Sequence, residues 1–193
     1  QKDSRLFVAT DAAEQNSFFG LGLQLHQNFF GHTVISHGGG VMGGTTYLAL
    51  LPERQLAVVL LSNAHAYPMR QLALAALATL LGEDFRQLDF VRIDNLLHSL
   101  EGRYSSFRDT IQAEVKRQGD TLKLKLKFKH EDRLIYLSSV SFTKERSRYK
   151  AFSNGHQQIV DFIHHEDKLE LVYERYCFRK KGETYAQQTP PQF

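Results

Sequence analysis

The stretch VISHGGGVMGG, residues 34–44, places one imidazole directly before a run of glycines. The ring of His37 can donate a hydrogen bond or help a neighbouring hydroxyl to lose its proton. Glycine has no Cβ, so a ligand can lie against the backbone at Gly38, Gly39 and Gly40. Amides freed from strand pairing there can stabilise charge on a carbonyl oxygen. The same residues also fit a bulged strand with an exposed histidine, so both interpretations stay open.

The elements around this stretch are predicted to be strands followed by a helix. Residues 18–27, FFGLGLQLHQ, are predicted to form one strand, and TVISH forms a short one. TTYLALL and LAVVLLSN are two apolar runs joined by residues 52–55, which predicts a hairpin. Both runs are nearly continuous in apolar residues, so the sheet is expected to be covered on both faces. Residues 68–81 begin with proline and precede Gly82, as a helix does.

Beyond residue 100 the apolar period changes to two. TLKLKLKFK, residues 121–129, alternates leucine or phenylalanine with lysine, which predicts a strand with one face in a core and one in water. About seven or eight short strands follow without a helix between them, which favours a small antiparallel barrel or sandwich. The lysine face either attracts polyanions or keeps the outer surface soluble, and we favour solubility.

The sequence therefore predicts an α+β fold: antiparallel sheet strands with a packing C-terminal helix, followed by a small antiparallel β-barrel. Residues 1–85 are expected to form the first domain, 86–99 a linker, 100–185 the barrel domain and 186–193 a loose tail. The charge changes at the same junction. Residues 1–85 carry four Lys/Arg and six Asp/Glu, whereas residues 86–193 carry twenty and fifteen.

Composition excludes several classes of function. The chain has 193 residues, of which 42% are hydrophobic and 23% charged, as in an ordinary globular protein. No apolar run reaches the roughly 18 residues that a membrane span needs. Cys177 is the single cysteine, which excludes an internal disulfide and a cysteine zinc site. HHEDK, residues 164–168, is interpreted as a hairpin end, and no metal site is expected. Without a phosphate loop, dinucleotide fingerprint or RNA-binding signature, no nucleic-acid partner is predicted.

Residues 18–82 resemble the C-terminal half of the serine β-lactamase and penicillin-binding-protein-like hydrolases, and most closely the class C-like esterases and peptidases. The shared pattern is an aromatic-Gly-x-Gly strand, a Lys-or-His-x-Gly triad, a further glycine, and an apolar hairpin ending in asparagine. The matching residues are Phe19, Gly20 and Gly22; His37, Gly38 and Gly39; Gly43 or Gly44; and Asn63.

The resemblance implies a role for each residue of the glycine stretch. His37 would be catalytic, assisting electrostatically, and Gly40 would offer its N–H as an oxyanion-hole donor. Gly38 and Gly39 would border the bound substrate. The resemblance also implies a peptide, ester or lactam substrate, no cofactor, and a periplasmic or secreted location. The barrel resembles, more loosely, the lipocalin-like domain appended to some members of this family.

The nucleophile of the family belongs to an S-x-x-K motif near the N-terminus of a full-length member, and none lies upstream of His37. S-x-x-K occurs at residues 141–144, but on a predicted strand Ser141 and Lys144 would point to opposite faces. The chain is therefore expected to be the C-terminal portion of a hydrolase without its nucleophile. Its partners would be the missing N-terminal part of the hydrolase domain and further copies of itself. The alternative is a non-catalytic binding or oligomerisation module built on the barrel, so enzymatic activity stays open.

Overall fold

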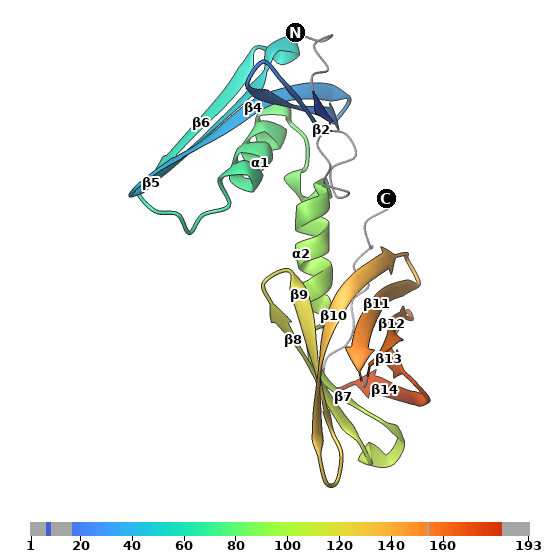
Figure 1. The fold of residues 1–193 in the computed structure, drawn as a ribbon. Helices are drawn as coiled ribbons and strands as arrows, with labels where there is room; N and C mark the ends of the chain where they lie inside the picture. The colour runs from blue at the N-terminus through green and yellow to red at the C-terminus, as the bar shows by residue number, and fades with distance from the viewer. Residues whose placement is uncertain (1–6, 9–16, 154, 183–193) are drawn as a thin grey trace. The chain divides into compact units, whose positions relative to one another are not determined.

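The computed structural model of the protein describes residues 7–8, 17–153 and 155–182, so the predicted loose tail of residues 186–193 lies outside the described part. The chain divides into two compact units, residues 1–88 and 89–193. The first holds an antiparallel sheet with a helix, and the second holds a helix and a closed antiparallel barrel (Figure 1). The predicted α+β fold is confirmed.

The sheet of the first unit is an antiparallel meander in the order β1-β2-β3-β4-β5-β6. A short 3-10 helix, η1, joins β5 to β6 where the hairpin connection was predicted. The bounds are β1 Phe7–Val8, β2 Ser17–Gly20, β3 Leu23–Phe29, β4 His32–Val41, β5 Gly44–Leu51, η1 Pro52–Arg54 and β6 Leu56–Ser62.

The strand predicted over residues 18–27 is a tight hairpin instead, formed by β2 and β3. Leu21 and Gly22 both have positive φ, 52° and 79°, and the strands pair up to Gly20↔Leu23. A two-residue turn with left-handed backbone at both positions matches the twist of the flanking strands. The prediction was wrong because Leu21, an apolar residue, occupies a turn position.

The predicted helix is confirmed as α1, Met69–Leu81, and it packs against β5 and β6. Its buried residues are Ala73, Leu74, Leu77 and Ala78. Pro68 precedes the helix. Gly82 ends it with φ 80°, and its N–H donates to the carbonyls of Ala78 and Thr79. The helix therefore covers one face of the sheet.

The opposite face of the sheet is not covered by any described residue, although coverage of both faces was expected. Along β6 the half-buried Leu56, Val58 and Leu60 alternate with exposed residues, of which Val59 is 61% and Leu61 77% exposed. A nearly continuous apolar run thus has one face against α1 and one open within the described residues.

The barrel of the second unit is a meander of consecutive strands, closed by the pairing of β14 with β7. Neighbouring strands pair antiparallel throughout, as in up-and-down barrels. The bounds are β7 Gly102–Ser105, β8 Gln112–Gln118, β9 Thr121–Lys127, β10 Asp132–Phe142, β11 Arg146–Ser153, β12 His156–His164, β13 Leu169–Tyr173 and β14 Tyr176–Lys180, with a short helix η3 Phe107–Asp109.

The barrel interior is filled by its own side chains. Leu122, Leu124 and Leu126 of β9 are fully buried, which confirms the predicted alternation of that strand. The largest interior side chains are aromatic: Tyr104, Tyr149, Phe162, Tyr173 and Phe178. An eight-stranded barrel has an interior just wide enough to be filled in this way.

Residues 86–99, expected to be a linker, hold the end of the short helix η2 (Phe85–Gln87) and most of α2 (Asp89–Leu100). Buried α2 residues join the hydrophobic core of the barrel: Leu96, Leu97 and Leu100, with Ile93 packed against them. The hydroxyl of Tyr104 donates to the carbonyl of Leu100 over 2.7 Å. This helix is therefore part of the barrel unit. Within the described chain, neither α2 nor any other helix has the length and apolar character to cross a membrane.

Candidate functional site

The glycine stretch lies on a regular strand. β4 and β5 pair without a register shift through His37↔Leu48, Gly38↔Tyr47, Gly39↔Thr46 and Gly40↔Thr45. The last pair is Val41↔Gly44, so Met42 and Gly43 form a two-residue turn, with Gly43 at φ 82°. The structure therefore brings all four sequence-predicted site residues together as consecutive positions of one strand.

The pairing pattern fixes where the amides of this strand point. A pair that closes a two-residue hairpin exchanges both of its hydrogen bonds, so the N–H and C=O of Val41 face β5. Alternate residues face opposite edges, so the N–H and C=O of Gly38 and Gly40 point away from β5. On that edge β3 pairs only as far as Gln24↔Ser36, and no other described strand continues the pairing. Within the described part of the chain, the amides of Gly38 and Gly40 thus face a free edge.

The three glycines differ in what a side chain would meet. A Cβ at Gly39 would lie 2.5 Å from Oγ1 of Thr46, which real Cβ atoms essentially never do. A Cβ at Gly38 would lie 3.4 Å from the ring of Tyr47, at the limit of ordinary contact. At Gly40 a Cβ would meet no described atom within 4 Å. Packing within the described residues therefore explains Gly39 but not Gly40.

His37 is exposed on the face of the sheet opposite α1, next to the half-buried Ile35 and Leu48 in the ladder. The strand beneath it is held in place by a buried hydrogen bond, in which the Tyr47 hydroxyl donates to Oγ of Ser36 over 3.0 Å. The imidazole is thus anchored on a rigid strand and remains accessible. It can offer a hydrogen bond to a ligand that lies along the free edge.

The end of the hairpin is fixed by two hydroxyls that share one acceptor. Thr45 Oγ1 and Ser62 Oγ donate to the carbonyl of Ala64 over 2.9 and 3.1 Å. Thr45 and Ser62 also form the terminal pair of the ladder between β5 and β6, and Asn63 directly follows Ser62 in the sequence. The asparagine of the family pattern therefore stands at the same end of the sheet as Gly40, the partner of Thr45 on β4.

Neither S-x-x-K sequence of the chain is a nucleophile of the family type. Ser141 and Lys144 lie exposed at the end of β10 and in the following turn, not on a helix. A second S-x-x-K, residues 147–150, lies within β11. Ser147 is fully buried inside the barrel, whereas Lys150 is exposed on the outside, as strand geometry requires.

The buried Ser147 instead pairs with a histidine, since its Oγ lies 2.8 Å from Nε2 of His164. Burial lowers the pKa of His164 to about 4, so the ring is neutral near pH 7. Both side chains are enclosed in the barrel core, at 0% and 5% exposure, so the pair stabilises the core and does not meet a substrate. The adjacent His165 contacts Glu170 through its Nε2, over 3.1 Å. Among the described residues, no cluster of three or more His, Cys, Asp or Glu side chains fits a metal ion.

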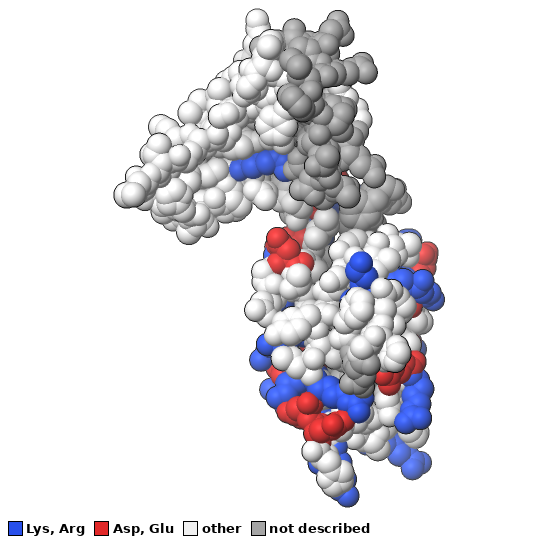
Figure 2. Space-filling view, viewed as in Figure 1, with Lys and Arg blue, Asp and Glu red and all other residues white. Residues whose placement is uncertain are grey.

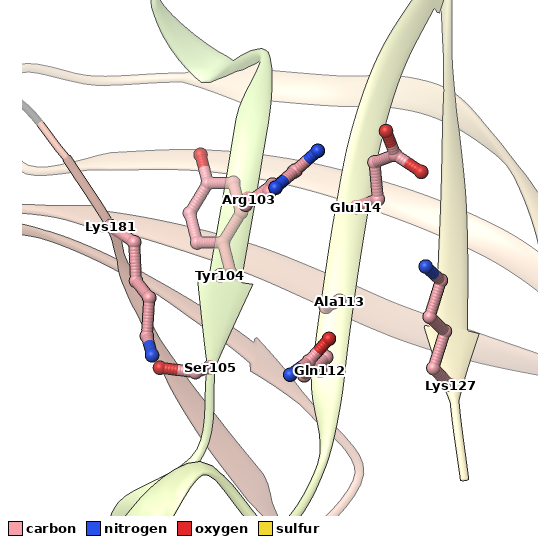
Figure 3. Close-up of a pocket in the computed structure, with 8 residues that line it drawn as sticks. All are labelled: Arg103, Tyr104, Ser105, Gln112, Ala113, Glu114, Lys127 and Lys181. Carbon is pink, nitrogen blue, oxygen red and sulfur yellow. The ribbon is translucent and has the colours of Figure 1, made fainter.

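A polar groove of about 330 Å³ lies on the barrel, and sequence reasoning did not predict it (Figure 3). Its lining residues come mainly from β7 and β8: Arg103, Tyr104, Ser105, Gln112, Ala113, Glu114, Lys127 and Lys181. Two of its charged side chains have partners: Lys181 Nζ lies 2.6 Å from Asp109 Oδ1, and Glu114 Oε1 lies 3.1 Å from Lys116 Nζ. The hydrogen bonds from these lysines lower the pKa of both carboxyls. The groove contains none of the predicted site residues.

Comparison with known proteins matches each unit separately. The Beta-lactamase family model matches residues 2–83, and the Pab87 octamerisation domain model matches residues 85–179. The solved structure of the octameric penicillin-binding protein homologue from Pyrococcus abyssi is 32% identical to this chain, with a TM-score of 0.73. That match covers 85% of this chain and 37% of the homologue, so this chain spans little more than a third of its length.

Other similarities are weak. The crystal structure of SurE with D-Leu aligns with 92% of this chain and 42% of its own length, at 20% identity and a TM-score of 0.31. Both values are too low for a structural inference. No curated protein matches the chain. The chain thus contains part of a β-lactamase-like domain, followed by a barrel that is similar to an octamerisation domain.

Proposed function

We propose that this chain contributes the His-x-Gly strand and one side of the oxyanion hole to a β-lactamase-like serine hydrolase. The free edge of β4, where the amides of Gly38 and Gly40 point away from β5, is the observation that supports this most directly. The similarity of residues 2–83 to β-lactamases and of the chain to a penicillin-binding protein homologue favours the same class.

In this proposal the substrate lies along the free edge of β4. The N–H of Gly40 donates to the carbonyl oxygen of a peptide, ester or lactam, on which negative charge develops when the nucleophile attacks. Gly38 and Gly39 border the substrate and leave room for it because they carry no side chain. His37, exposed on the same strand, assists by donating a hydrogen bond to the substrate or by accepting one from the attacking hydroxyl, which helps that hydroxyl to lose its proton.

The nucleophile and its base come from the remaining part of the hydrolase domain, which we expect to cover the open face of the sheet. That face carries half-buried Ile35, Leu48 and Leu50 and exposed Val59 and Leu61, an apolar surface of the kind that marks an interaction site. A covering domain would remove this surface from water and bring a serine to the edge of β4. This chain alone is accordingly expected not to hydrolyse ester or lactam substrates.

The test is a pair of substitutions at Gly40 in the intact protein that carries this chain. Gly40→Pro removes the proposed donor, yet the missing N–H faces the free edge, so strand pairing is retained. Turnover of a p-nitrophenyl ester or a chromogenic cephalosporin should fall about 10²- to 10³-fold. Gly40→Ala keeps the N–H and meets no described atom within 4 Å, so it should turn over near the parent rate.

A substitution at the neighbouring residue, Val41, serves as the control for folding. Val41→Pro removes an N–H that faces β5 and should lower the melting temperature, whereas Gly40→Pro should not. Circular dichroism and thermal melting distinguish the two. A folded Gly40→Pro variant that hydrolyses substrate at the parent rate would exclude the Gly40 N–H as an oxyanion donor.

A second function is supported by an independent observation, the match of residues 85–179 to an octamerisation domain. We propose that the barrel unit assembles copies of this chain, as the octameric state of the Pyrococcus abyssi homologue suggests. Assembly does not depend on catalysis. This proposal is therefore also compatible with the alternative that the chain is a non-catalytic module. Analytical ultracentrifugation of the purified chain tests it, and a monomer at all concentrations would exclude it.

A further inference from the structure

We propose that a specific patch on the outer wall of the barrel is the surface where a second copy of this chain docks, an inference that rests on the assembly function proposed above. The barrel patch consists of Leu134 and Tyr136 on β10, Phe152 on β11 and Ile159 on β12. These side chains are 50%, 56%, 72% and 42% exposed. Large apolar side chains left in water at adjacent positions mark interaction surfaces.

The strand register places these residues side by side. The last pair of β10 with β11 is Leu137↔Ala151, and both of these residues point into the core. Tyr136 and Phe152 are the next residues along their strands, so both point outward at the same level. Ile159 pairs with Lys150, two residues from Phe152, which makes Ile159 its diagonal neighbour on the outer face.

Leu134 extends the patch along β10, because residues two apart on a strand share a face. Its partner on β9 is Lys125, and the partner of Tyr136 is Lys123. The Nζ of Lys123 lies 5.4 Å from the centre of the Tyr136 ring. The patch is thus an apolar centre bordered by lysines, similar to interfaces that have an apolar core and a polar rim.

The rest of the described barrel surface is different. Apart from Phe107 near β7 and Val140 at the β10 bulge, all exposed large apolar side chains of the described barrel unit belong to the patch. Elsewhere charges of both signs are interspersed, as the displayed face of the barrel unit in Figure 2 shows. Burial of the patch would therefore cover four of the six large apolar side chains that the described barrel unit exposes.

A second copy is the occupant that the comparisons favour. The whole patch, residues 134–159, lies inside the segment that matches the octamerisation domain. It is also separate from the open sheet face of the first unit, for which we propose the rest of the hydrolase domain as the partner. Tyr136 is of a residue type that often dominates association energy at interface centres, and phenylalanines such as Phe152 are enriched at interfaces.

The experiment compares two glutamate substitutions by sedimentation velocity over a range of concentrations. Phe152→Glu puts a charge at the centre of the patch, and Phe107→Glu puts one at an equally apolar side chain, 81% exposed, outside it. Phe152→Glu should raise the dissociation constant of the assembly about 30-fold or more, the effect of losing a central anchor. Phe107→Glu should leave the assembly unchanged.

The outcomes separate this proposal from the function on which it rests. A parent chain that is always monomeric excludes the assembly function itself. If the parent assembles and a folded Phe152→Glu variant assembles equally well, the patch is not the docking surface for a second copy. The assembly function itself then stands. An equal loss with Phe107→Glu also overturns the proposal for the patch. If Phe152→Glu does not fold by circular dichroism, Ile159→Glu is measured in its place, with the same expected result.

Discussion

Two buried tyrosines of the barrel have similar burial but different hydroxyl environments. Tyr104 and Tyr149 are each 1% exposed, and each ring packs edge-on against Phe162. The Tyr104 hydroxyl donates to the carbonyl of Leu100, whereas the Tyr149 hydroxyl has no hydrogen-bond partner among the described residues. Burial also raises the pKa of Tyr149 far above its usual range. The two hydroxyls should therefore contribute to stability with opposite sign.

Replacing each tyrosine with phenylalanine measures this difference. Tyr104→Phe should lower the free energy of unfolding by about 1 kcal/mol, because it removes a hydrogen bond and leaves a buried carbonyl with fewer partners. Tyr149→Phe should leave the stability unchanged or raise it by up to about 1 kcal/mol, because it removes a buried hydroxyl without a partner. Urea denaturation of both variants is the measurement. A larger loss for Tyr149→Phe than for Tyr104→Phe would mean that an ordered water satisfies that hydroxyl.

At the candidate site, His37 and the three glycines that follow it were selected from residue types and spacing, and their roles stay a prediction. Residue types and spacing did not distinguish the roles of the glycines. Those roles depend on the register with β5, which decides that the N–H of Gly40 faces the free edge and that a side chain at Gly39 would require the Thr46 hydroxyl to move. Register is a property of two strands together, so no motif in one of them contains it.

Among the elements, β9 alternates buried and exposed residues, so substitutions at neighbouring positions should change the free energy of unfolding by different amounts. Leu124 is fully buried, whereas Lys125 is 41% exposed in its side chain and forms a surface ion pair with Asp132 over 2.8 Å. Leu124→Ala should destabilise the protein by roughly 2–5 kcal/mol. Lys125→Ala should leave the stability nearly unchanged, because an exposed ion pair contributes little. Chemical denaturation checks both values, and equal effects would contradict the assignment of faces.

Elements with a strong period were predictable, and those decided by a single backbone position or by tertiary packing were not. The alternation of β9 and the proline and glycine that flank α1 indicated the correct structures. The turn at Leu21 was missed because an apolar residue adopts a left-handed backbone there. The helix α2 was assigned to a linker, although Ile93, Leu96, Leu97 and Leu100 recur at helical spacing.

For the whole molecule, the division into two units predicts that the barrel unit folds alone. Its core cluster contains only residues from Leu96 to Phe178, all within the second unit. A fragment of residues 89–193 should therefore unfold cooperatively and keep the self-association of the parent. A fragment of residues 101–193 lacks Leu96, Leu97 and Leu100 and should be several kcal/mol less stable, since each buried leucine contributes about 2 kcal/mol.

Thermal melting and sedimentation of both fragments are the measurements. Equal stability of the two fragments would contradict the assignment of α2 to the barrel core. A folded fragment of residues 89–193 that stays monomeric while the parent assembles would place the assembly surface in the first unit.

The closure of the barrel by β14 and β7 has a consequence for the synthesis of the chain. β7 and β14 are the first and last strands of the meander. They pair through Arg179↔Ser105 and Lys180↔Tyr104. The ribosome must synthesise the whole segment from β7 to β14 before the barrel can close. At about 5–20 residues per second, this synthesis takes roughly 4 to 15 seconds. Throughout that interval the nascent sheet has an unpaired edge on each side, and each edge can pair with another unfinished chain. Pairing of β14 with β7 removes both edges at once, so this protection is complete only after the last strand of the barrel has been made.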